Sequence, residues 1–95
     1  PTVMRELYAT MQTPGMVSFD MDAVDQAHAP GVSAPATGGF GVAQWLQFAY
    51  EAGRHAAVRS CDVSEFNPML DRDGQTGRLA ALTVWHTLRG FAARG

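Results

Sequence analysis

Three carboxylates are spaced so that they could bind a cation together. Asp20 and Asp22 come directly after a short apolar run, and Glu65 lies near the end of a second one. Side chains two residues apart in a strand point to the same face, so Asp20 and Asp22 are expected to project together. Two close carboxylates raise each other's pKa unless a cation keeps both ionised. Because hard divalent ions such as Mg²⁺ and Mn²⁺ accept carboxylate oxygens well, this pair predicts a metal site.

The same residues allow a second interpretation. Asp20 and Asp22 could be turn acids at the start of a loop, and Glu65 could be a solvated residue at a strand end. The chain would then be a non-enzymatic α/β fragment or an interaction module. The two interpretations differ in whether the three carboxylates open toward one cleft.

The patterns around these residues predict the elements that position them. Apolar residues at a spacing of three or four predict helices, and short apolar runs predict strands, the first of them buried on both faces. The loop after the acidic pair is long and rich in glycine and proline, so we expect it to be functional. Thr76 is expected to cap the last helix. The expected order is a helix at 2–12, a strand at 16–19, a loop at 24–41, a helix at 42–57, a strand at 58–66 and a helix at 76–92.

This order, α-β-loop-α-β-α, predicts an α/β fold with parallel strands joined by right-handed crossovers. In such a sheet Glu65 emerges at the same edge as the two aspartates, which is where sites form in open parallel sheets. Two strands are too few for a free-standing parallel sheet, so we expect a piece of a larger domain. The apolar side of the last helix is expected to face a core; its residues are Leu79, Leu82, Val84, Trp85, Leu88 and Phe91.

Composition excludes several classes of protein. The 95 residues are 46% hydrophobic and 17% charged, which rules out intrinsic disorder. Seven basic against nine acidic residues leave no basic footprint for nucleic acid, and no apolar run is long enough to span a membrane. Cys61, the single cysteine, cannot form an internal disulfide. We therefore expect a cytoplasmic protein with a small-molecule substrate and without nucleic-acid or membrane partners; a homo-oligomer of the complete protein is left open.

Two motifs carry a family resemblance. SFDMDAVD at 18–25, followed by APG at 29–31, resembles the last signature of the ureohydrolases, the family of arginases, agmatinases and formimidoylglutamases. DVSEFNP at 62–68 is similar to the next block of that family, and the resemblance extends over about 17–90. It implies a three-layer α/β/α arginase-like domain with a parallel sheet, of which residues 1–95 would be the C-terminal portion.

The resemblance also implies roles for the three carboxylates. In that family the first aspartate bridges two Mn²⁺ ions and the second binds one of them; these roles fall on Asp20 and Asp22. The glutamate pairs with a cationic group of the substrate, a role that falls on Glu65. The family's other ligands lie in a Gly-Gly-x-His block and an Asp-x-His-x-x-x-Asp-like block, and neither occurs in this chain. The chain alone is therefore expected to be inactive, with no catalytic residue of its own.

The implied activity is manganese-dependent hydrolysis of a C–N bond in a guanidino or formimidoyl group. The family's commoner pattern has proline after the third aspartate, whereas Gln26 follows Asp25 here. This pair is more similar to the formimidoylglutamase members, which convert N-formimidoyl-L-glutamate to glutamate and formamide in histidine degradation. An arginase or agmatinase activity is the alternative.

Overall fold

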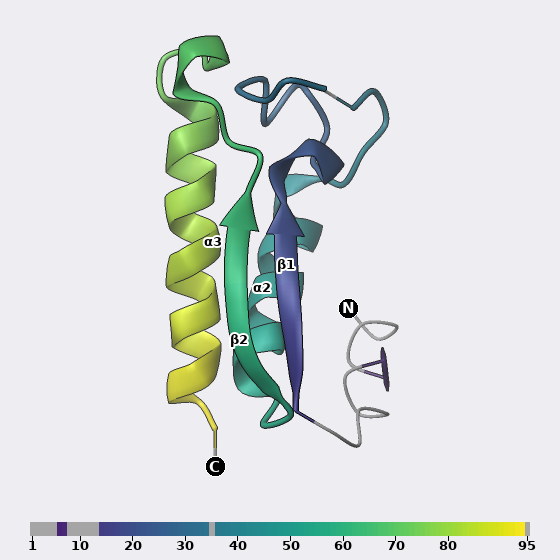
Figure 1. Ribbon diagram of the computed structural model, residues 1–95, viewed down its shortest axis with the longest axis vertical. Helices are drawn as coiled ribbons and strands as arrows, with labels where there is room; N and C mark the ends of the chain where they lie inside the picture. Colours follow the sequence, from purple (N-terminus) through teal and green to yellow (C-terminus); the bar gives the residue numbers. More distant parts are fainter. Residues whose placement is uncertain (1–5, 8–13, 35, 95) are drawn as a thin grey trace.

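The computed structural model describes residues 6–7, 14–34 and 36–94, and its main elements are two parallel strands and two long helices (Figure 1). The predicted α/β class is confirmed. The helix predicted at 2–12 lies outside the described residues except for 6–7, which are helical. The elements are β1 (Gly15–Asp20), the 3₁₀ helix η1 (Met21–Ala23), α2 (Val42–Arg54), β2 (Val58–Ser64), the 3₁₀ helix η2 (Pro68–Leu70) and α3 (Gln75–Ala92).

The two strands pair in parallel, as predicted, and they end together. Gly15 is opposite Val58 at one end, and Asp20 is opposite Ser64 at the other. α2 connects the strands and runs back behind them, while α3 lies along β2 (Figure 1). Both strands therefore deliver their C-terminal residues to the same edge of the sheet, which is the edge from which sites form in parallel sheets.

The prediction that the first strand is buried on both faces is wrong for the described residues. Phe19 is the buried residue of β1, whereas Met16 is 61% exposed and Ser18 and Asp20 are also exposed. Side chains alternate along a strand, so packing on one face leaves every second residue outside. In the described part of the chain, the buried face of β1 is the one that meets Trp45 of α2. The rings of Phe19 and Trp45 pack edge to face, with their centroids 5.6 Å apart.

The core is densest at the end of the strands where the acidic residues lie. Met21, Val24, Ala29 and Val32, all in η1 or the loop that follows it, are fully or almost fully buried. The loop predicted as irregular is thus a structural part of the core, because it contributes the buried side chains of Val24, Ala29 and Val32. The buried hydrophobic residues are Phe19, Met21, Val24, Ala29, Val32, Trp45, Ala49, Ala52, Val58 and Leu79.

The helices α2 and α3 touch through their backbones. A Cβ atom at Gly53 would overlap the carbonyl oxygen of Thr87, and one at Gly90 would overlap that of Tyr50. Glycine inside a helix costs about 1 kcal/mol relative to alanine. Here that cost accompanies a close approach of two helix axes that no other residue allows.

The apolar side predicted for α3 is mostly not a core. Leu79 is buried, but Trp85 and Phe91 are each 55% exposed, and Leu82, Val84 and Leu88 are exposed as well. α3 instead presents smaller residues to the interior, among them Thr76, Thr83 and Gly90. Close contact with α2 selects small residues on that side, so the larger ones lie on the other sides of α3 and stay exposed.

No helix in the described ranges is both long enough and apolar enough for a membrane crossing.

Replacing Gly90 by alanine is expected to lower the free energy of unfolding by about 3 kcal/mol, because the new methyl group meets a backbone carbonyl that cannot move aside. Thermal or urea unfolding measures the change. Gly41→Ala is the control, since a Cβ there meets nothing within 4 Å and should cost about 0.5 kcal/mol. Equal stability of the two variants would show that the helices do not meet in this way.

Candidate metal and substrate site

Asp20 and Asp22 are brought together by a turn rather than by a strand. Asp20 is the last residue of β1, and its Oδ1 accepts a hydrogen bond from the N–H of Asp22 at 2.9 Å, which caps η1. The prediction that both side chains share one face of a strand is therefore wrong for Asp22, which lies inside η1. Met21 between them is fully buried, so the core holds the turn in place.

One carboxylate oxygen at this turn lacks a hydrogen-bond partner among the described residues. This atom, Oδ1 of Asp22, is buried. A buried carboxylate oxygen without a partner is costly unless a cation offsets its charge. Oxygen ligands of this kind suit Mg²⁺ or Mn²⁺. The chemistry of the Asp20–Asp22 pair thus fits the metal that the sequence predicts.

Glu65 leaves the sheet next to this pair, in a costly backbone conformation. It directly follows Ser64, the residue opposite Asp20 in the ladder, so it emerges at the predicted edge. Its φ angle is 67°, in the left-handed region that non-glycine residues seldom adopt. Such strain costs about 1–3 kcal/mol and is concentrated at functional sites. Nothing in the sequence indicates this conformation, because glutamate has no preference for it.

The loop after the aspartates is closed on itself by Asp25. Its carboxylate accepts hydrogen bonds from the amides of Ala27 and Gly38, both at 2.9 Å, and these bonds lower the pKa of Asp25. Two isolated bridges, Val24 with Phe40 and Asp25 with Ala36, join the two ends of the loop. The two ends of the loop are therefore held together, directly beyond the turn that carries Asp20 and Asp22.

The first turn of α3 is capped differently from the prediction. Thr76 lies inside α3 and is fully buried, whereas Gly74 occupies the N-cap position with a φ of 71° and no capping side chain. The cap comes from Asp71, whose carboxylate accepts from the amides of Thr76 at 2.8 Å and Gly77 at 3.0 Å. Sequence reasoning missed Asp71 because a cap four residues before the helix depends on the path of the intervening turn.

Hydrogen bonds stabilise the ionised form of the Asp71 carboxylate. Burial raises its pKa, but hydrogen bonds from the amides of Thr76 and Gly77 and from the Thr76 side chain outweigh that effect and lower the pKa to about 2. The carboxylate is therefore ionised throughout the neutral range, and its charge faces the positive end of the helix dipole.

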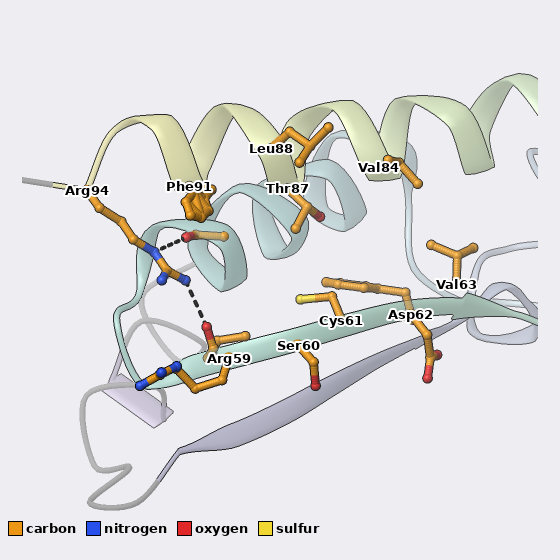
Figure 2. A pocket seen from close by; sticks show the side chains of 13 residues that line it. Arg59, Ser60, Cys61, Asp62, Val63, Val84, Thr87, Leu88, Phe91 and Arg94 are labelled. Atoms are coloured by element: carbon orange, nitrogen blue, oxygen red, sulfur yellow. Dashed lines mark hydrogen bonds between the residues drawn. The ribbon is translucent and has the colours of Figure 1, made fainter.

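The hollows in the described part of the chain include one beside the loop after η1 and one beside α3. The smaller, of about 440 Å³, lies between the loop after η1 and the start of α3; it is lined by Asp25, Gln26, Ala27, Pro30, Arg72 and Gln75. The larger, of about 600 Å³, runs between β2 and α3. Neither of these two hollows is lined by Asp20, Asp22 or Glu65. Figure 2 shows Cys61 and Val63 on its β2 side and Phe91 on its α3 side.

The larger hollow is apolar and is closed at one end by Arg94. The Arg94 guanidinium donates to the carbonyl oxygens of Gly53 at 2.7 Å and of His55 and Val58 at 2.8 Å. These bonds tie the end of α3 to the end of α2 and to the start of β2. This arrangement supports the fold rather than chemistry, so the candidate site is the carboxylate edge.

A change of pH tests the cap. Asp71→Asn is expected to be less stable than the wild type at pH 7, because it loses a carboxylate whose folded pKa, about 2, lies below its unfolded value of about 3.9. That stabilisation is fully present above about pH 4 and disappears as the pH falls through about 2. Urea unfolding at pH 7, 4 and 2.5 measures the convergence of the two proteins, with Asp73→Asn as a control in the exposed turn. A constant gap between wild type and Asp71→Asn at all three values would contradict the assignment.

The chain is similar to a known protein family and to curated sequences. The sequence model of the Arginase family matches residues 1–89. The chain is 47% identical over 77 residues to the formimidoylglutamase of Aromatoleum aromaticum, and the match covers 78% of this chain and 22% of that protein. It is 40% identical over 74 residues to the formimidoylglutamase of Halalkalibacterium halodurans, covering 78% of this chain and 23% of that protein. The chain thus spans less than a quarter of the length of these curated relatives.

Solved structures show the same arrangement of elements. Formiminoglutamase of Trypanosoma cruzi, crystallised with Mn²⁺, aligns with a TM-score of 0.91 and 28% identity over 99% of this chain and 32% of that one. Formimidoylglutamase of Bacillus subtilis aligns with a TM-score of 0.80 and 33% identity over 83% of this chain and 25% of that one. Arginase of Bacillus subtilis aligns with a TM-score of 0.84 and 28% identity over 92% of this chain and 33% of that one.

Proposed function

This chain belongs to the arginase family, and we propose that it supplies one side of a two-manganese site in an enzyme that hydrolyses N-formimidoyl-L-glutamate. The single observation that carries this proposal is the buried Oδ1 of Asp22, which has no hydrogen-bond partner in the described part of the chain. The manganese in a similar solved structure and the names of the similar sequences support the choice of metal and of substrate.

Asp20 and Asp22 are the residues that would hold the metal. The described residues contain no cluster of three or more potential ligands, so this pair is only part of a site, and the proposal places the other ligands elsewhere in the complete polypeptide. When bound, two divalent ions lower the pKa of a water molecule enough for it to act as a nucleophile near neutral pH.

The contributions of this chain's own residues follow from their positions. The amide of Asp22 holds the carboxylate of Asp20 at 2.9 Å, so the pair is fixed before any ligand arrives. The carboxylate of Glu65 offers a negative charge to a cationic amidine at the same edge of the sheet. Fixed charges of this kind orient a substrate and stabilise charge best when water is excluded. We therefore assign Glu65 to substrate binding and no residue of this chain to proton transfer.

An arginase or agmatinase activity is the second candidate. The likeness to an arginase of Bacillus subtilis favours it, because guanidino substrates carry the same cationic C–N centre as formimidoyl substrates. Gln26 after Asp25, together with the formimidoylglutamase names of the similar sequences, favours the first candidate. A role in histidine degradation and a cytoplasmic location belong to the same proposal.

Removal of either aspartate is expected to abolish most manganese binding. In the complete polypeptide, Asp20→Ala and Asp22→Ala should each lower the bound Mn²⁺ per chain and reduce kcat/KM for N-formimidoyl-L-glutamate by at least about 100-fold. Metal analysis after dialysis and a formamide-release assay measure the two effects, with arginine and agmatine as competing substrates.

A matched control for the metal variants is Asp62→Asn. Asp62 is an exposed carboxylate on the neighbouring strand that accepts a hydrogen bond from Ser18 Oγ at 2.6 Å, and it does not lie at the end of β2. It should keep both metal and activity. Unchanged metal content in both alanine variants would leave the carboxylates as turn acids and reject the metal site.

Glu65→Gln is expected to raise KM and lower kcat/KM by about 100-fold while leaving the Mn²⁺ content unchanged. The amide keeps the shape of the side chain but removes the charge that would pair with the amidine, and loss of one partner of a desolvated ion pair typically costs a few kcal/mol. Steady-state kinetics with metal analysis checks this; an unchanged kcat/KM would show that Glu65 does not bind the substrate.

A further inference from the structure

The backbone that carries Glu65 is strained and is held again two residues later. Ser64 is the last residue of β2 that pairs with β1, and Glu65 then takes a φ of 67°. A conformation of this kind persists only where its surroundings fix it. The amide of Asn67 supplies one such contact, because it donates to the carbonyl oxygen of Gly31 at 2.6 Å. The position of Glu65 therefore depends on the position of Gly31.

Gly31 belongs to the loop that follows the two aspartates, and it has a second contact. Its own amide donates to Oγ1 of Thr76 at 2.7 Å, and Thr76 is fully buried. One residue of the metal-binding loop thus contacts the segment after Glu65 through its carbonyl group and the first turn of α3 through its amide. Gln75 reinforces the second contact, since its Nε2 donates to the carbonyl oxygen of Ala27 at 2.7 Å.

Asp71 completes a closed set of contacts around Gly31. Oδ1 of Asp71 accepts from the amide of Thr76 at 2.8 Å, which fixes the residue that receives the Gly31 amide. A Cβ atom at Gly31 would lie 2.8 Å from the Cβ and 2.9 Å from the Cα of Asp71, so the two backbones are already in contact. At Gly31 the loop after the aspartates therefore has no room to shift toward Asp71.

We propose that Thr76, oriented by Asp71, is a positioning residue that sets Glu65 at its working distance from the Asp20–Asp22 pair. This inference rests on the proposed function, in which those three carboxylates act on one substrate. Thr76 acts through Gly31 and Asn67 and is not itself a catalytic residue. The contact matters because the strand ladder ends at Ser64, so the sheet alone does not fix the residue that follows it.

The chain offers a matched control on the same helix. Thr83 is as deeply buried as Thr76, and its Oγ1 also accepts one hydrogen bond, from Nε1 of Trp45 at 3.0 Å. That bond joins α3 to α2, whereas the bond of Thr76 joins α3 to the metal-binding loop. Thr76→Val and Thr83→Val remove equivalent hydroxyl groups, so they separate a positioning effect from a loss of packing or polar satisfaction.

In the complete enzyme, Thr76→Val is expected to lower kcat/KM for N-formimidoyl-L-glutamate by about 10- to 100-fold, since small displacements of a binding group have effects of this size. Its Mn²⁺ content should stay at the wild-type value, and Thr76→Ser, which retains the hydroxyl, should recover most of the activity. Hydrogen exchange at the amide of Asn67 should be faster in Thr76→Val. Thr83→Val should lower the unfolding temperature at least as much as Thr76→Val but change neither kcat/KM nor that exchange rate.

A double variant gives the sharpest comparison. If Thr76 acts through Glu65, adding Thr76→Val to Glu65→Gln should lower kcat/KM by no more than about twofold further. A full additional loss in the double variant, or equal kinetic losses in Thr76→Val and Thr83→Val, would show that the hydroxyl only stabilises the fold, and the inference would be wrong. A wild type without amidine hydrolysis, or a Glu65→Gln variant with unchanged kcat/KM, would reject the proposed function and this inference with it.

Discussion

The parallel pairing of β1 with β2 is the constraint on which the rest of the structure depends. It ends on the pair Asp20 and Ser64, so two segments more than forty residues apart leave the sheet at one point. Parallel strands need a long crossover, and α2 supplies it within a short chain. The turn that contains Asp22 follows Asp20 directly, and the strained Glu65 follows Ser64 directly.

Buried core residues and the candidate site lie at the same end of the strands. Met21 and Val24, among the best buried residues, flank Asp22, whose Oδ1 is buried without a partner. A fold tolerates an unpaired carboxylate oxygen only where other contacts offset its cost, and the apolar side chains around the turn provide them. The same burial keeps water away from the oxygen and leaves it available to a cation. The exposed residues of β1, by contrast, contribute little to the core.

The packing of α2 against α3 places the first turn of α3 in contact with the loop after the aspartates. The contact of Gly53 and Gly90 with opposing carbonyl groups sets the separation of α2 and α3. The first turn of α3 then reaches the loop after the aspartates through Thr76, and Arg94, two residues beyond the end of α3, reaches the end of α2. α3 is thus fixed at both ends, while its larger apolar residues stay largely exposed, three of them (Val84, Leu88 and Phe91) along the hollow between α3 and β2.

Local patterns in the sequence predicted the order of β1, α2, β2 and α3, the parallel pairing of the strands, and the shared edge at which Asp20 and the residue before Glu65 end the ladder. These features depend on residue type and short-range periodicity, which a single sequence displays directly. Three features are visible only in the folded chain: Asp22 lies in a 3₁₀ turn, Glu65 takes a left-handed conformation, and Asp71 rather than Thr76 caps α3. The exposure of most of the apolar side of α3 is also visible only there. These features depend on contacts between residues that are far apart in sequence. Gly31 and Thr76, for example, are 45 residues apart, so no local pattern predicts that the amide of Gly31 donates to the hydroxyl of Thr76.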